Sequence, residues 1–205
     1  MPIKEENRLF TIGCSSFSVE HLINRLKKYG INVVVDVRSV PYSHYTPQFN
    51  ADVLKSVLWQ QHIAYRDFSK EFGARRIEKD AYVQNCVDFK KVMELPAFLH
   101  GVDRIKAGLA SNFRIALMCT EKDPARCHRF SLVARGIEKK INVHSIHILQ
   151  DGTVLSKEAI ESRLIQNMNI VDDFFIKKTP LELLYEKLER QVAYTMNKRN
   201  EDELY

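Results

Sequence analysis

The sequence has 205 residues, of which 45% are hydrophobic and 28% are charged, and its formal net charge at pH 7 is +5. These values exclude a low-complexity chain and are typical of one α/β domain with an appendage. Because the longest apolar runs are only of strand length, they also exclude a membrane-spanning helix. The modest positive charge suits an anionic partner, although it is equally ordinary for a globular protein.

The chain contains four cysteines, namely Cys14, Cys86, Cys119 and Cys127. Its first residues are polar and lack the apolar stretch of a signal peptide. Because free thiols are usual in a reducing compartment, we expect a cytoplasmic protein that does not bind a membrane.

The first part of the chain predicts a strand, a helix and a second strand. The apolar run 9–12 ends at the small-residue loop 13–16, and Ser18 can cap a helix that ends at Gly30. Residues 31–36 are then nearly all apolar, as in a central parallel strand. This order favours a βαβ unit.

The next segments predict a loop followed by helices. Residues 41–50 are rich in aromatic and hydroxyl groups, and loops of this length are often binding loops. Asn50 can cap a helix over 51–61, and residues 62–65 are compatible with a short strand. Residues 85–110 are expected to be helical, with a break before Pro96.

The densest group of reactive side chains follows a buried strand at 115–119. Asp123 and Pro124 are typical of a helix start, so we expect a helix over 124–138. The motif Cys127-His128-Arg129 would then lie at the end of its first turn, where free N–H groups favour anions.

The last part of the chain predicts one more strand and two helices. Residues 141–148 suit a strand nearer the sheet edge, followed by a turn and a helix over 156–169. Thr179 starts a capping box in the segment 170–205. We expect this segment to pack on the body or on a second subunit, which would give a possible homodimer.

The overall prediction is an α/β fold with a mainly parallel Rossmann-like or flavodoxin-like sheet flanked by helices. Residues 1–169 would form the α/β domain and residues 170–205 a helical C-terminal extension. In a parallel sheet, the segments Gly13–Ser15, Asp36–Arg38 and Cys119–Glu121 emerge at the same edge, where α/β proteins build their sites.

This edge carries side chains suited to an anionic substrate. Arginine guanidinium groups bind phosphate and carboxylate, and hydroxyl groups can hold an anion's oxygens. The side chains expected to bind the substrate are Ser15, Arg38, Tyr42, His128 and Arg129.

Three further side chains are candidates for catalysis. Asp36 is placed as a general base, Glu121 is a second carboxylate for proton transfer, and Cys127 is a possible nucleophile. The alternatives are structural: Asp36 can form an internal ion pair with Arg38 or Arg129, and Cys127 can be a small buried packing residue.

A metal site is another possibility. Cys14, Cys119, Cys127 and His128 are soft ligands of the kind that select zinc. However, their spacing is not that of a zinc finger, and adjacent residues of a helix point about 100° apart. We therefore predict no bound metal or cofactor, and keep a thiol sensor or zinc protein as the third functional hypothesis.

Nucleic acid is a possible partner. Tyr42, Tyr45 and Phe49 can stack on bases, but the basic residues are spread along the chain among carboxylates. The leading hypothesis is an enzyme for an anionic, nucleotide-like or phosphorylated substrate. The alternative is a non-catalytic nucleic-acid or nucleotide-binding module.

The strand ends and loops together resemble a known family over about residues 8–150. The motifs are Thr11-Ile12-Gly13, Val35-Asp36-Val37-Arg38, Pro41, Pro47-Gln48-Phe49-Asn50, Met118-Cys119 and Cys127-His128-Arg129. They resemble the bacterial and archaeal family called domain of unknown function 488, which implies an α/β fold and no particular activity. The chain departs from the family pattern at Cys14, where His is more usual, and at Phe72-Gly73-Ala74, which replaces Leu-Gly-Gly.

Overall fold

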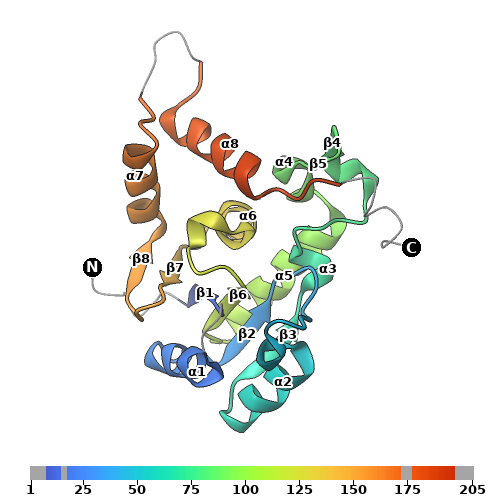
Figure 1. Cartoon of the computed structure of the whole chain (residues 1–205), viewed down its shortest axis with the longest axis vertical. Helices are drawn as coiled ribbons and strands as arrows, with labels where there is room; N and C mark the ends of the chain where they lie inside the picture. The colour runs from blue at the N-terminus through green and yellow to red at the C-terminus, as the bar shows by residue number, and fades with distance from the viewer. Residues whose placement is uncertain (1–7, 15–17, 172–176, 197–205) are drawn as a thin grey trace.

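A computed structural model of the chain describes residues 8–14, 18–171 and 177–196 (Figure 1). It confirms the predicted α/β class, with a six-stranded sheet in the order β3-β2-β6-β1-β7-β8. The strands are β1 (Leu9–Gly13), β2 (Val33–Asp36), β3 (Ala64–Asp67), β6 (Ile115–Cys119), β7 (Ser145–Ile148) and β8 (Val154–Ser156). All neighbouring pairs are parallel except β7 with β8.

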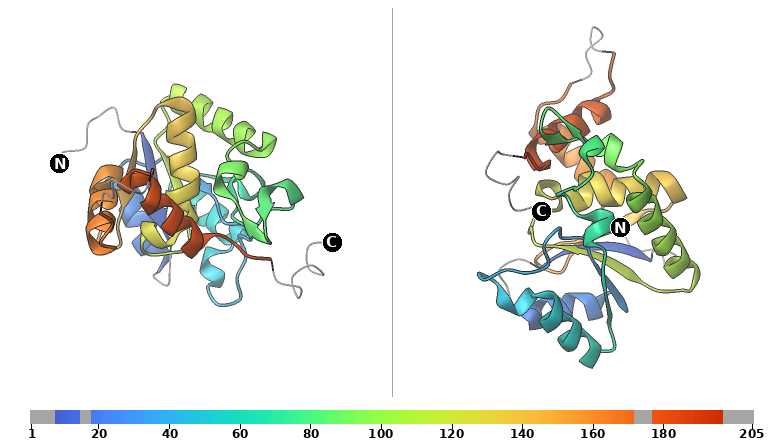
Figure 2. Two further views of the ribbon diagram at one scale, coloured as in Figure 1. Left: turned by 90° about the horizontal axis from the view of Figure 1, so that it is seen from above. Right: turned by 90° about the vertical axis from the view of Figure 1, so that its right-hand side faces the viewer.

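Helices cover both faces of this sheet, as the right-hand view of Figure 2 shows. The helices are α1 (Val19–Lys28), α2 (Ala51–Gln60), α3 (Ser69–Phe72), α4 (Phe89–Val92), α5 (Pro96–Ala110), α6 (Arg135–Ile141), α7 (Lys157–Asn167) and α8 (Pro180–Val192). Short 3₁₀ turns occur at η1 (Pro47–Phe49), η2 (Lys79–Ala81) and η3 (Pro124–Arg126), and β4 (Tyr82–Val83) pairs with β5 (Cys86–Val87).

Alternation along the strands divides the core into two layers. On β6, Ala116 and Met118 pack with α1 and α2 on one face, whereas Leu117 and Cys119 pack with α5 and α6 on the other. Successive side chains of a strand point to opposite faces, so a strand buried on both sides is apolar throughout.

The strand register brings three carboxyl ends together, as predicted. Gly13 of β1 is level with Cys119 of β6, and Asp36 of β2 is level with Met118. The chain leaves β2 through α2 on one face and leaves β6 through α6 on the other. Diverging connections of this kind open a crevice beyond the carboxyl ends of neighbouring strands.

The predicted helix over 124–138 is wrong in its first part. The 3₁₀ turn η3 ends at Arg126, and the backbone of the next residue, Cys127, is extended, with φ −137° and ψ 139°. A π-helical segment, η4 (Arg129–Ala134), then continues into α6. The side chain of Asp123 caps the 3₁₀ turn by accepting a hydrogen bond from the Ala125 amide, 2.9 Å long, so it does not start the long helix.

Other differences are local. Residues 82–87 form the β4–β5 hairpin, so the helical region predicted from 85 begins only at Phe89. Strand β8 was not predicted, because the three residues after the turn at 151–152 carry too little periodicity. Asn50 precedes α2, but its side chain makes no capping bond and instead accepts one from the Ser43 amide.

The C-terminal helix α8 packs on the body of the same chain. Its residues Leu184, Tyr185 and Leu188 are buried in an apolar cluster with Phe130 of η4 and Leu164 of α7. The predicted capping box at Thr179 is present. The apolar stripe of the helix is therefore used within one chain, and the homodimer remains a prediction.

None of the helices in the described part of the chain combines the length and the apolar character that crossing a membrane requires.

The buried His147 on β7 generates a prediction about pH. Its Nδ1 lies 2.8 Å from Thr11 Oγ1, and Nε2 lies 3.3 Å from Ser145 Oγ. Ser145 donates its hydroxyl to Glu138, so its oxygen accepts from Nε2–H of His147. Burial, helped by the charges of Arg129 and Lys157, lowers the pKa of His147 from 6.5 to about 3.

Between these values the unfolded chain takes up a proton at this residue and the folded chain does not. The free energy of unfolding should therefore fall as the pH is lowered from about 6.5 towards about 3. In His147→Gln, urea denaturation at several pH values should show a flatter dependence. In the control His144→Gln, which changes a side chain that is 76% exposed, the dependence should stay as in wild type. An unchanged slope in His147→Gln would contradict the assignment.

Candidate functional site

A pocket lies over the carboxyl ends of β2 and β6, with a cavity of about 540 Å³. Its walls come from four separate parts of the chain: residues 38–40 after β2, residues 74–75, the β6–helix connection, and residues 191–195, which include the last two residues of α8. A cavity of this size is typical of a small-molecule site. Three arginines line it, namely Arg38, Arg75 and Arg126.

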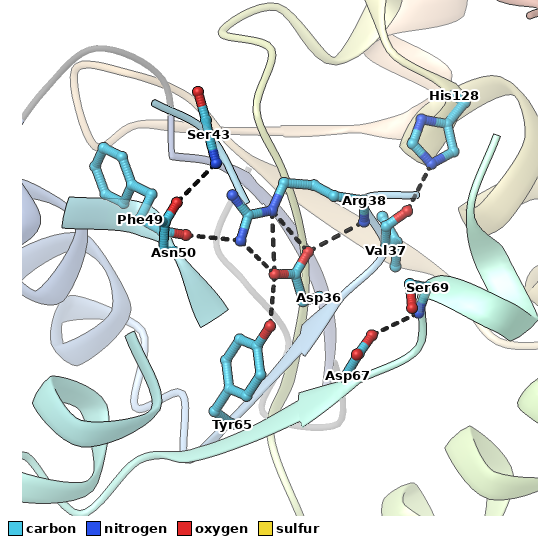
Figure 3. A network of polar contacts seen from close by, with 10 residues as sticks. All are labelled: Asp36, Val37, Arg38, Ser43, Phe49, Asn50, Tyr65, Asp67, Ser69 and His128. Carbon is cyan, nitrogen blue, oxygen red and sulfur yellow. Dashed lines mark hydrogen bonds and ion pairs between the residues drawn. The ribbon is translucent and has the colours of Figure 1, made fainter. Parts of the chain in front are cut away.

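Asp36 is the centre of a buried polar network at one side of the pocket (Figure 3). Its carboxylate accepts bonds from Arg38 Nε, 2.9 Å from Oδ1, and from Arg38 Nη2, 2.5 Å from Oδ2. The Tyr65 hydroxyl donates to Oδ2 over 2.8 Å. Asp36 is 0% exposed. The internal Asp36–Arg38 ion pair considered from the sequence is thus present, and a carboxylate held in this way is a poor candidate for a general base.

The same network orients Arg38. Its Nη2 also donates to the Phe49 carbonyl over 2.8 Å, whereas Nη1 has no hydrogen-bond partner among the described residues. Burial opposes the charge of Arg38, but the adjacent carboxylate outweighs burial and raises the pKa of Arg38. Burial and the nearby Asp36 raise the pKa of Tyr65. Arg38 therefore remains charged, and within the described part of the chain its Nη1 is the guanidinium nitrogen without a hydrogen-bond partner.

Two thiols and an imidazole converge at the inner end of the pocket. The Nδ1 atom of His128 lies 3.9 Å from Cys119 Sγ and 3.9 Å from Cys127 Sγ, and the three atoms lie within 4.8 Å of one another. All three side chains are buried, yet all three contribute to the pocket wall. On the far side of the ring, Nε2 is 2.9 Å from the Val37 carbonyl (Figure 3).

The environment separates the acidities of the two thiols. Burial raises the pKa of Cys127, but the hydrogen bond with Cys119 and the charges of Arg129 and His128 outweigh it and lower that pKa well below its ordinary value. The same hydrogen bond, with burial, raises the pKa of Cys119. For His128, burial lowers the pKa, and the contacts with Cys127 and the Val37 carbonyl reverse this and raise it.

Arg129 has a supporting position behind this cluster. It is 0% exposed, and its Nη1 and Nη2 donate to the carbonyls of Glu121 and Lys122 over 2.7 and 3.2 Å. Its Nε has no hydrogen-bond partner in the part of the chain that the structure describes. Arg129 does not line the pocket, so this geometry makes it a residue that holds the loop after β6. Its predicted contact with a substrate has no support from this arrangement.

The other predicted residues are placed differently. Glu121 is exposed and lines the pocket, and its carboxylate makes no ion pair with a described residue. Tyr42 is 57% exposed, lies edge-on to His44 and is not part of the pocket wall. Ser15 lies outside the described residues. Loop 41–50, a binding-loop candidate from the sequence, does not line the pocket, and its Phe49 carbonyl accepts a hydrogen bond from Arg38.

Residues 191–195 form a pocket wall that sequence reasoning missed. Figure 1 shows the chain running from α8 towards the β4–β5 hairpin. There the Val87 amide donates to the Tyr194 carbonyl over 2.9 Å. The guanidinium carbon of Arg75 lies over the Tyr194 ring, 5.2 Å from the ring centroid. The sequence contains no sign of this pairing, because the segment has neither a motif nor a long periodic run.

The different environments of the Asp36 and Glu121 carboxylates can be tested by measuring the free energy of unfolding. Asp36→Ala leaves the buried Arg38 without its partner, so it should lower the free energy of unfolding by about 3–5 kcal/mol. Glu121→Ala removes an exposed carboxylate and should change it by no more than about 0.5 kcal/mol. Urea denaturation followed by circular dichroism measures both. An equally small effect of the two substitutions would contradict the anchoring role of Asp36.

Comparison with known proteins supports the family resemblance. Neither the curated proteins nor the solved structures give a significant match. The family model described as "Domain of unknown function DUF488" matches residues 18–135, which is more than half of the 205 residues. The matched range contains the Asp36–Arg38 pair and the Cys119, Cys127 and His128 cluster. The chain therefore belongs to the DUF488 family.

Proposed function

We propose that this protein is an enzyme that acts on a small anionic substrate, nucleotide-like or phosphorylated, bound in the pocket over β2 and β6. The observation that carries the proposal is that three arginines from three distant parts of the chain line one cavity, which ends at a cluster of two thiols and an imidazole. A cation-lined cavity favours an anion, and a group of thiols and imidazole can perform chemistry on it.

The arginines are suited to hold an anion in a defined orientation. Arg38 is fixed by Asp36 and keeps Nη1 available. The backbone amide of Arg75 donates to Ser39 Oγ over 2.9 Å, and its guanidinium lies over Tyr194. Arg126 is exposed and has no ion-pair partner among the described residues. Guanidinium groups of this kind bind phosphate oxygens in pairs.

The geometry also supports a division of roles among the predicted catalytic residues. Asp36 acts through Arg38, so we assign it a positioning role. Glu121 lines the pocket with an exposed carboxylate and is assigned to proton transfer. Cys127 belongs to the chemical centre together with Cys119 and His128.

Binding of anions tests the proposal. Inorganic phosphate and a panel of nucleotides should raise the melting temperature of the wild-type protein. Arg75→Ala and Arg126→Ala should each weaken binding about tenfold or more, because each removes charge-assisted hydrogen bonds. Lys106→Ala is the control, since it removes the same charge from an exposed position on α5 outside the pocket.

A wild-type protein that responds to none of these anions would contradict the proposal. Turnover of the bound compounds, followed by mass spectrometry, separates the enzyme from the non-catalytic binding module, because both would use the same arginines. Binding without turnover of any compound in the panel would favour the module.

A further inference from the structure

We infer that Cys119, Cys127 and His128 bind a zinc ion whose fourth coordination position faces the arginine-lined pocket. The inference deepens the proposed function and rests on it only for the use of the fourth position. The three protein ligands follow from the geometry of the cluster alone.

The spacing of the three ligand atoms fits a tetrahedral ion. Bonds of about 2.3 Å to sulfur and about 2.0–2.1 Å to nitrogen place neighbouring ligand atoms of a tetrahedral zinc site roughly 3.6–3.8 Å apart. Both sulfur-to-Nδ1 separations in this cluster are 3.9 Å. An ion between these atoms therefore requires shifts of a few tenths of an ångström in the two sulfur-to-nitrogen separations, and of at most about 1 Å between the two sulfurs, because all three atoms lie within 4.8 Å of one another. Two thiolates with one imidazole are a donor set that selects zinc.

The ring of His128 is oriented as in a metal site. A carbonyl oxygen only accepts hydrogen bonds, so the 2.9 Å contact with Val37 assigns the N–H to Nε2. In the neutral ring the lone pair then lies on Nδ1, the atom that faces the two sulfurs. Histidines that bind metals commonly donate their other ring N–H to a backbone carbonyl, which fixes both the tautomer and the orientation.

The local backbone removes the objection raised by the sequence. The side chains of two adjacent helical residues point apart. Cys127, however, has an extended backbone between η3 and the following helix, whereas His128 has helical dihedral angles. Their side chains can therefore turn towards the same point. The backbone amide of Arg129 also donates to Cys127 Sγ over 3.5 Å, which favours a thiolate. Cys14, the other cysteine of the original zinc hypothesis, is not part of the cluster.

The pocket provides the entry path and the open position. The three ligands lie in its wall, together with Glu121 and Arg126. Three protein ligands with one position left for water or substrate are typical of catalytic zinc. A zinc-bound water has a lowered pKa, and Glu121 is placed in the same pocket to accept its proton. With zinc bound, Cys127 is a ligand, and this replaces its predicted role as a nucleophile.

Metal analysis is the first test. Full-length protein, purified under reducing conditions with its affinity tag removed, should contain about one zinc per chain by elemental analysis. Cys119→Ser, Cys127→Ser and His128→Gln should each lower the zinc content about tenfold or more. Cys86→Ser is the matched control and should keep its zinc, because that thiol is outside the cluster.

Cobalt substitution of the wild-type protein makes the test independent of how well these variants fold. Protein stripped with a chelator and reloaded with Co²⁺ should show absorption bands of a tetrahedral ion and of thiolate-to-cobalt charge transfer. Inorganic phosphate should then shift the tetrahedral bands if the fourth position opens into the pocket. Unshifted bands in protein that binds phosphate would show a closed site and would overturn the assignment of the open position.

Reduced wild-type protein that contains no zinc and gives no cobalt bands would overturn the inference. The inference would also be overturned if protein purified without reductant contained a Cys119–Cys127 disulfide and still bound no metal after that disulfide was reduced. The proposed function is tested independently of the zinc site. Metal-free protein that binds phosphate would support anion binding without zinc, and zinc-loaded protein that binds no anion would contradict the proposed function.

Discussion

A fully buried guanidinium determines how the candidate site is built. Arg129 donates to the carbonyls of Glu121 and Lys122 and so ties the loop after β6 to the start of the following helix. The loop is packed directly on the end of β1, since a Cβ added to Gly13 would lie 2.1 Å from the Glu121 carbonyl oxygen. A larger residue at Gly13 would therefore displace the loop, and with it the pocket wall formed by residues 119–121.

Two further contacts connect this arrangement to β2. His128 donates to the Val37 carbonyl, which joins the helix start to the residue just after β2. The Asp36 carboxylate aligns Arg38 beside it. Buried ion pairs with several additional hydrogen bonds are costly to break on one side, so they hold a side chain in one orientation. The thiols and the arginine thus face one cavity because backbone and side-chain contacts together restrict the strand ends.

The pocket combines two parts of the chain with different relationships to the family. Its inner end and all three of its arginines lie within residues 18–135, the range matched by the family model. The wall at 191–195 lies outside that range and is held by the β4–β5 hairpin and by the packing of Arg75 on Tyr194. The residues of the inner end therefore lie within the family domain, whereas residues 191–195 of the C-terminal segment supply a further wall of the pocket.

The sequence by itself determined the parallel strands, most helix caps and the meeting of three strand ends at one edge. Apolar runs, Ser18, Ser156 and Thr179 act within a few residues, so a single sequence is enough to detect them. Only the tertiary structure decided which partner Asp36 takes, that Cys127 lies outside the helix, and that residues 191–195 close the pocket. These outcomes depend on packing between segments far apart in the chain, which local periodicity does not encode.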